Sequence, residues 1–308
     1  MSFVFNVIVK IEKGTQGNPA RQYLGRFIRF IFPKFWFSTF LMRLIEEWRR
    51  TISVTVQGKS MYVNLKDKGV SLSLYRDHIW EPYETSLLLK LLKQKMTFVD
   101  IGANIGYYTV LASDAVGPQG RVFAFEPDPV NLDLLRKNIR INHCSNIIIE
   151  PRAVSDKSGH GQLYLSKIYF GDHRIYKSHD NEIYNLGVER STISIGEVAL
   201  DEYYDINPKG IDVVKMDIQG AEYKALQGMK ETLKKNKDII MVSEFWPHGL
   251  FQAGANPNTF LQELVDLGFM IYDFAILCKI PVSPKVVLTR LKGTEHTDLL
   301  FIRRILNV

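Results

Sequence analysis

From Thr97 onward, apolar runs of strand length alternate with segments of helical periodicity. The predicted strands cover residues 97–101, 121–126, 146–154, 211–218, 238–245, 268–274 and 298–304. The predicted helices cover residues 105–116, 128–142 and 221–235, and a further helix starts at Asn256 and Pro257. Apolar strands that alternate with amphipathic helices are typical of a mostly parallel sheet covered by helices on both faces. The alternation therefore predicts an α/β fold.

The first fifty residues differ from the rest of the chain in charge and aromatic content. They hold nine Lys or Arg against three acidic residues, an excess equal to the formal net charge of +6 of the whole chain. Aromatic and basic side chains are interleaved between residues 20 and 50, and Pro33 interrupts any single helix there, so we expect two short helical pieces. Such a mixture suits the headgroup region of an anionic bilayer, and it suits equally a lid or a dimer contact.

Residues 1–50 are therefore treated as a basic, aromatic extension, and residues 51–308 as one domain. Residues 51–66 read as a β-hairpin around Gly58, and residues 85–308 as the α/β core. Cys144 and Cys278 are far apart without a CxxC spacing, which argues against a disulfide framework and a zinc site. No leader pattern and no apolar stretch of about 18 residues is evident. We expect a cytoplasmic protein, with peripheral attachment to the inner membrane surface as an open alternative.

The segment FVDIGANIGYYT at residues 98–109 places a glycine loop directly after the first strand of the alternation. In sheets of this kind, ligands bind outside the carboxyl ends of the strands. A dinucleotide fingerprint would read GxGxxG, but Asn104 stands where a glycine would admit a pyrophosphate. Glu126 ends the next strand, at the interval from Gly102 expected for an acceptor of ribose hydroxyls. The combination predicts an adenosine ligand without a pyrophosphate.

The glycine loop is followed by the segments VFAFEPDPVNLDLLRKNI, RAVSDKSG, LDEYY and VVKMDIQGAEYKALQG. Together, these segments resemble the FkbM-type methyltransferases of the class I S-adenosylmethionine-dependent fold, over roughly Thr51 to Arg303. The resemblance implies a seven-stranded, mostly parallel, doubly wound Rossmann-like sheet, here preceded by the hairpin and the basic aromatic extension. It also implies S-adenosyl-L-methionine as cofactor and O-methylation of a sugar, glycolipid, lipid-linked saccharide or related metabolite. Nucleic acid is not expected as a partner, because the domain is balanced in charge.

The same resemblance assigns residues to the cofactor. The residues implied at its methionine end are Asp100, Gly102, Ala103, Asn104 and Gly106. Glu126 is implied at the ribose, and Ala153 and Asp156 are implied near the adenine.

Methyl transfer to a hydroxyl needs a base unless the acceptor is already acidic. Asp217 ends the fourth strand, across from the glycine loop, and His173 lies in the long region between the third and fourth strands. We predict these two as catalytic residues, and the sequence leaves the choice between them open. Arg174, Glu244 and His248 are predicted substrate-binding residues.

Two alternatives to this interpretation stay open. Asp217 and Glu244, at neighbouring strand ends, are a pair that could hold a divalent metal ion, so metal dependence is unknown. The competing functions are a nicotinamide-dependent oxidoreductase, which Asn104 disfavours, and a non-catalytic adenosyl-binding adaptor at a membrane surface.

Overall fold

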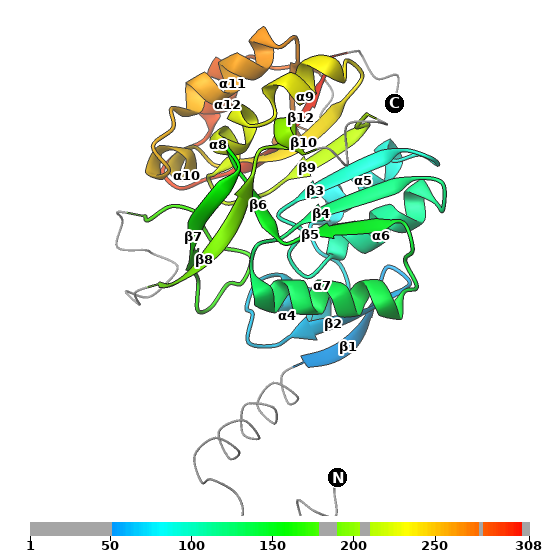
Figure 1. Cartoon of the computed structure of the whole chain (residues 1–308). Coiled ribbons are helices and arrows are strands. Elements are labelled where there is room, and N and C mark those ends of the chain that lie inside the picture. Colours follow the sequence, from blue (N-terminus) through cyan, green and yellow to red (C-terminus); the bar gives the residue numbers. More distant parts are fainter. Residues whose placement is uncertain (1–50, 179–189, 204–209, 277–279, 304–308) are drawn as a thin grey trace, which may run out of the picture. The chain divides into compact units, whose positions relative to one another are not determined.

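The computed structural model describes residues 51–178, 190–203, 210–276 and 280–303 (Figure 1). The chain divides into two compact units, Met1–Thr51 and Ile52–Val308, and the fold described here is that of the second. The helical pieces predicted before residue 50 and Cys278 lie outside the described ranges. No helix within these ranges is long and apolar enough to cross a membrane.

Strands and helices alternate along the described chain. The strands are β1 (Thr51–Val56), β2 (Lys59–Asn64), β3 (Thr97–Ile101), β4 (Arg121–Phe125), β5 (Ile147–Glu150), β6 (Arg152–Val154), β7 (Gly159–Leu165), β8 (Ser191–Val198), β9 (Val213–Met216), β10 (Ile240–Phe245), β11 (Met270–Asp273) and β12 (Thr297–Ile302). The helices are α4 (Val70–Asp77), α5 (Pro82–Leu91), α6 (Tyr107–Val116), α7 (Pro129–Ile141), α8 (Glu222–Gln227), α9 (Lys230–Lys235), α10 (Pro247–Gln252), α11 (Pro257–Asp266) and α12 (Pro284–Arg290).

The main sheet has seven strands in the order β11-β12-β10-β9-β3-β4-β5. Only β12 runs antiparallel to its neighbours β10 and β11, and the other neighbouring pairs are parallel. The predicted seven-stranded, mostly parallel sheet is thus confirmed. From β3 the chain continues outward to β4 and β5, and it later returns to the other side of β3 through β9 and β10. This reversal makes the carboxyl ends of β3 and β9 the switch point at which such sheets bind ligands.

The two faces of the sheet pack against separate helical layers (Figure 1). Successive residues of β3 point to opposite faces, so Phe98 packs with α5, α6 and the hairpin, whereas Val99 packs with α8, α9 and α11. Both side chains are fully buried. Burial on both faces explains why the strands read as mostly apolar runs in the sequence.

The predicted hairpin is formed by β1 and β2, which make their own two-stranded sheet. Gln57 and Gly58 both have positive φ at its turn, as a tight two-residue connection requires. Asn138 of α7 covers the edge of β2, because its side chain accepts a hydrogen bond from the Tyr62 N–H (2.6 Å) and donates one to the Tyr62 carbonyl (3.1 Å). The hairpin is therefore fastened to the core through α7.

The single strand predicted at residues 146–154 is divided in two. β5 belongs to the main sheet, but β6 leaves it and pairs with β8 in a three-stranded sheet of order β6-β8-β7. Pro151 stands between the two strands. Because proline has no N–H to donate to a ladder, the chain changes sheets there.

The helix predicted at residues 221–235 is also interrupted. α8 ends at Gly228, where a Cβ would lie 2.0 Å from the carbonyl oxygen of Ser155. The second piece, α9, receives a side-chain cap from outside the helix, since the Asp201 carboxylate accepts hydrogen bonds from the N–H groups of Glu231 and Thr232. The close approach of residue 228 to the backbone at Ser155 therefore ends the helix, although the helical periodicity of the sequence continues.

Candidate active site

The glycine loop at residues 102–106 joins β3 to α6 at the switch point. The N–H groups of Gly102 and Ala103 donate to the carbonyl of Phe125 at the end of β4 (3.0 and 2.9 Å). Gly102 has a φ of +86°, and a Cβ there would lie 2.1 Å from the Asp217 carbonyl oxygen. Any side chain at this position would push the ends of β3 and β9 apart. The contact between strand ends thus requires glycine before any ligand is considered.

Two cavities open at the carboxyl ends of the strands. The first cavity extends from β4 toward the three-stranded sheet and is lined by Glu126, Asn131 and Ala153, among others. The second, wider cavity lies toward α4 and α5 and is lined by Glu81 and Lys215, among others. The cavities share the lining residues Gly102, Asn104, Gly171 and Asp217. Two ligands, one in each cavity, would meet at this shared wall.

Glu126 is the buried acid of the first cavity. Its Oε2 accepts a hydrogen bond from the Asn104 N–H and its Oε1 one from the Asp128 N–H, both at 2.8 Å. Burial raises the pKa of Glu126 to about 8, although the two backbone donors counteract the rise. The carboxyl group is held rigidly between two turns, at the position predicted for a ribose acceptor.

Asn131 was not predicted from the sequence as a site residue. It lies in the first turn of α7, whose N-cap is Asp128 as expected. Its side-chain N–H group donates to the Phe170 carbonyl (3.2 Å), whereas its Oδ1 is buried without a hydrogen-bond partner among the described residues. A buried acceptor without a partner is costly, so this oxygen favours a ligand that brings a donor into the first cavity.

Lys215 and Asp217 point into the second cavity from β9 and its end. The Lys215 ammonium lies 3.3 Å from Asp217 Oδ2 and 4.6 Å from the centre of the Tyr108 ring. Burial opposes the charge of Lys215, but the carboxylates of Asp217, Glu81 and Asp100 outweigh burial and raise its pKa. The lysine is therefore a fixed cation beside the predicted base.

Glu81 and Glu244 complete the charged wall of the second cavity. Glu81 accepts a hydrogen bond from the Tyr108 hydroxyl (2.8 Å), and burial raises its pKa to about 7 despite the nearby Lys215. Burial and the charge of Asp217 also raise the pKa of Glu244. Several carboxyl groups thus crowd around one cation.

Gln219 lies between the two carboxylates that were considered as a metal-binding pair. Its Nε2 donates to Asp217 Oδ1 (2.8 Å) and to Glu244 Oε2 (3.1 Å). Within the described residues, no group of three or more His, Cys, Asp and Glu side chains is placed to hold a metal ion. The Gln219 amide group therefore bridges the two carboxylates at the position considered for a metal ion.

His173 lies in the first cavity and not in the second. Its Nδ1 accepts a hydrogen bond from the Ser166 N–H (3.0 Å), and its Nε2 lies 3.7 Å from Asp128 Oδ2. With Nδ1 as acceptor, the neutral ring carries its proton on Nε2, facing the carboxylate. In this arrangement neither nitrogen has a lone pair available to take a proton from an acceptor hydroxyl.

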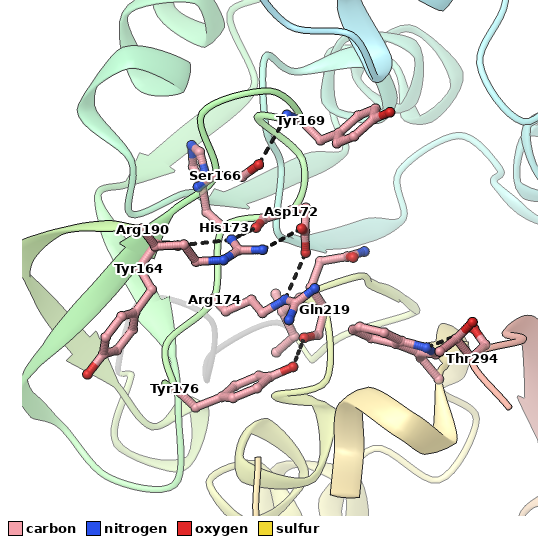
Figure 2. Close-up of polar contacts among 12 residues, drawn as sticks. Tyr164, Ser166, Tyr169, Asp172, His173, Arg174, Tyr176, Arg190, Gln219 and Thr294 are labelled. Carbon is pink, nitrogen blue, oxygen red and sulfur yellow. Dashed lines mark hydrogen bonds and ion pairs between the residues drawn. The ribbon is translucent and has the colours of Figure 1, made fainter. Parts of the chain in front are cut away.

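Arg174 is part of an ion-pair network around Asp172, a residue that lines the second cavity (Figure 2). The Asp172 carboxylate pairs with Arg174 (2.8 Å) and with Arg190 (2.5 Å), and the Arg174 guanidinium lies over the Trp246 ring at 4.9 Å. The Arg174 side chain is only 5% exposed. The network fixes the segment that carries Gly171 into the wall shared by both cavities, and the predicted contact of Arg174 with substrate stays a prediction.

Of the other residues predicted from the sequence, Ala103 and Glu244 line the second cavity and Ala153 lines the first. The residues that line neither are Asp100, Gly106, Asp156, Arg174 and His248. Asp100 is buried beneath the loop, where it accepts a hydrogen bond from the Thr109 hydroxyl (2.6 Å). Asp100 therefore supports the loop from inside the fold.

Glu81, Tyr108, Asn131, Lys215 and Gln219 were missed as site residues. Lys215 alone gave a usable signal, because a lysine inside the apolar run VVKM is unexpected in a strand buried on both faces. The position of Glu81, which comes from the start of α5, depends on tertiary structure that no local pattern shows.

The raised pKa values predict how stability changes with pH. Burial raises the pKa of Glu81 and Glu222 to about 7 and that of Glu126 to about 8, from ordinary values of about 4.5. Between pH 4.5 and 8 these three groups bind more protons in the folded protein than in the unfolded chain. Their contribution to the free energy of unfolding is therefore largest below about pH 4.5, and it is lost as the pH rises to about 8. We expect the thermal midpoint to fall over this range, and the fall to be shallower in Glu126→Gln. A midpoint that rises would contradict the assignment.

The chain is similar to a known protein family and to several characterised proteins. Residues 100–271 match the methyltransferase FkbM domain family. The chain is 27% identical over 175 residues to methyltransferase sdnD of Sordaria araneosa (49% of this chain, 67% of that protein). It is 29% identical over 161 residues to the 2-O-methyltransferase NoeI of Sinorhizobium fredii (48% and 63%), and 29% over 157 residues to the hexuronic acid methyltransferase AglP of Haloferax volcanii (50% and 59%).

Among solved structures, the chain is similar to an FkbM methyltransferase from Methylobacillus flagellatus. The identity is 20%, the TM-score is 0.42, and the similarity covers 74% of this chain and 49% of that chain. The alignments with the curated relatives span about two thirds or less of each relative's length.

Proposed function

The chain belongs to the methyltransferase FkbM domain family, and we propose that it transfers the methyl group of S-adenosyl-L-methionine to a hydroxyl of a sugar, a glycolipid or a related metabolite. The observation that carries this proposal is the wall shared by the two cavities, where Asp217 faces both. A donor in the first cavity and an acceptor in the second would be brought together there, which is the main requirement for an in-line methyl transfer.

S-adenosyl-L-methionine is the methyl donor of this family, and the residues that line the first cavity suit its adenosyl part. Glu126 is an acceptor for ribose hydroxyls, and the partnerless Oδ1 of Asn131 is an acceptor for an amino group such as that of adenine. Ala153 adds a small apolar wall. When bound, the cofactor supplies an electrophilic methyl group on a sulfonium.

Asp217 is the proposed general base. Its carboxylate lines the second cavity, where it would accept the proton of the acceptor hydroxyl as charge develops on the oxygen. Gln219 fixes the orientation of one carboxylate oxygen, and Lys215 lies beside the other. His173 is the weaker candidate, because its Nδ1 is used by Ser166 and it faces the first cavity.

The names of two relatives support an oxygen acceptor on a saccharide. NoeI is a 2-O-methyltransferase and AglP a hexuronic acid methyltransferase.

The direct experiment is to incubate the full chain with S-adenosyl-L-methionine and a panel of sugars, glycolipids and hydroxylated metabolites, and to measure demethylated cofactor and acceptor mass together. A gain of one methyl on a hydroxyl supports the proposal. Methylation only of nitrogen or carbon would contradict it.

Tyr176 is expected to influence turnover without touching the acceptor. Its hydroxyl donates to the Gln219 carbonyl (2.8 Å), and Gln219, at a strained φ of 56°, orients Asp217 through its side chain. We expect Tyr176→Phe to lower kcat roughly threefold to tenfold with little change in cofactor affinity, as for loss of one hydrogen bond. Tyr164→Phe is the matched control, because no hydrogen bond from its hydroxyl is found within the described residues. Equal kcat values for the two variants would contradict the positioning role.

The N-terminal extension lies outside the described residues, so its role rests on the sequence. We propose that residues 20–50 make peripheral contact with anionic membranes, which would suit a lipid-linked acceptor. The full chain should sediment with anionic vesicles, and less so at high salt, whereas a chain starting at Thr51 should stay in the supernatant. If the two chains behave alike, packing of the extension becomes the better account.

A further inference from the structure

The second cavity carries an excess of acidic groups over basic groups. The carboxyl groups of three residues, Glu81, Asp217 and Glu244, line it together with one buried ammonium, that of Lys215. Asp172 also lines the cavity, but its carboxylate is neutralised by two arginines. The remaining titratable lining groups are the hydroxyls of three tyrosines and the exposed His296 at the edge.

The Lys215 ammonium already has partners within the protein. Its ammonium pairs with Asp217 at 3.3 Å and lies over the Tyr108 ring. Glu81 and Glu244 form no ion pair within the described residues. Glu81 receives one hydrogen bond from the Tyr108 hydroxyl, and Glu244 receives one from the Gln219 side chain. Both acids therefore retain capacity to accept further donors.

A fourth carboxyl group increases the crowding from the neighbouring strand. Asp298 of β12 lies directly opposite Glu244 of β10 in the antiparallel register. Burial, and then the charge of Glu81, raise the pKa of Asp298 well above its ordinary value. Buried carboxyl groups in one cluster raise the pKa values of one another, and a cation placed in the cavity would favour their ionised forms.

Aromatic side chains form the other part of the cavity lining. Trp80, Tyr107, Tyr108 and Tyr169 all line it. Aromatic rings contribute apolar contact area and attract cations through their faces. The lining therefore combines groups that bind a ring-shaped, hydroxylated molecule with groups that bind positive charge.

We propose that the second cavity selects an acceptor that carries a protonated amine, such as an amino sugar, over neutral and carboxylate-bearing acceptors of the same size. The inference rests on the proposed function, because it assumes that the second cavity is the acceptor site. Glu244 and Glu81 would hold the amine through charge-assisted hydrogen bonds, and Asp217 would remain with the acceptor hydroxyl.

The test uses the full chain saturated with S-adenosylhomocysteine and three methyl glycosides that differ in one group. These are the glucoside, the 2-amino-2-deoxyglucoside and the glucuronoside, titrated by ligand-observed NMR, which detects weak binding. The amino glycoside should bind at least about tenfold more tightly than the glucoside, and the glucuronoside more weakly than both. Glu244→Gln should reduce the preference for the amine severalfold, whereas Asp114→Asn, an acid outside the cavity, should leave it unchanged.

Three results would overturn the proposal. The first is equal binding of the amino glycoside and the glucoside, or no measurable binding of the amino glycoside. The second is tightest binding of the glucuronoside. The third is binding of the glucoside that appears only with added Mg²⁺ and disappears with a chelator, which would assign the acids to a metal ion. Loss of S-adenosylhomocysteine binding itself would instead contradict the proposed function, so the two failures are distinguishable.

Discussion

Asp217→Asn should lower turnover by roughly 10² to 10⁴, while the affinity for S-adenosylhomocysteine stays nearly unchanged. The amide is nearly the same size and can still meet Gln219, but it cannot accept the hydroxyl proton. Lys215 would also lose the partner 3.3 Å away. The measurement is single-turnover methyl transfer, paired with calorimetric titration of the cofactor product.

His173→Ala and treatment with a chelator are the comparisons that decide the mechanism. Because His173 faces the first cavity, its loss should affect cofactor affinity more than the rate of the chemical step. If His173→Ala shows the whole loss and Asp217→Asn keeps wild-type turnover, the assignment of the base is wrong. If both variants stay active and the chelator abolishes activity, a metal ion carries the step that is assigned here to Asp217.

Gly102→Ala should lower the affinity for S-adenosyl-L-methionine at least tenfold and the free energy of unfolding by about 2 to 4 kcal/mol. The added Cβ would lie 2.1 Å from the Asp217 carbonyl oxygen, so the ends of β3 and β9 must separate. Those same ends form the wall shared by both cavities. Calorimetric titration and denaturant unfolding measure the two effects.

Gly58→Ala is the matched control for backbone strain. Gly58 has a similar φ of +77°, but a Cβ there would meet nothing within 4 Å. This variant should therefore lose only about 1 to 2 kcal/mol of stability and keep cofactor affinity. If Gly102→Ala matches this control in both measurements, the loop does not line the cofactor site.

The sequence predicted the sheet well because short apolar runs alternate with segments of helical periodicity. Asp128 and Asn256 were correctly placed at helix starts, since each side chain accepts backbone N–H groups of the first turn. The errors occur where distant contacts decide the local structure. Gly228 interrupts a helix because the Ser155 carbonyl approaches it, and β6 leaves the main sheet after Pro151.

The site was predicted to the extent that it lies at strand ends. Gly102, Glu126, Asp217 and Glu244 come together because the carboxyl ends of parallel strands share one edge. The lining of the second cavity was harder to predict from the sequence, because Glu81 enters it from the start of α5 and not from a strand end. The environment of His173 was also beyond sequence reasoning, since its hydrogen bond with Ser166 depends on how that segment folds.

The most direct test of the cofactor assignment is calorimetric titration of the full chain with S-adenosyl-L-methionine, S-adenosylhomocysteine and a nicotinamide dinucleotide. The structure predicts binding of one equivalent of either adenosyl compound and no binding of the dinucleotide. It also predicts that Glu126→Ala weakens the affinity for the adenosyl compounds by about 1 to 3 kcal/mol, as for the loss of two hydrogen bonds from the ribose hydroxyls. Binding of the dinucleotide without binding of S-adenosyl-L-methionine would contradict the assignment.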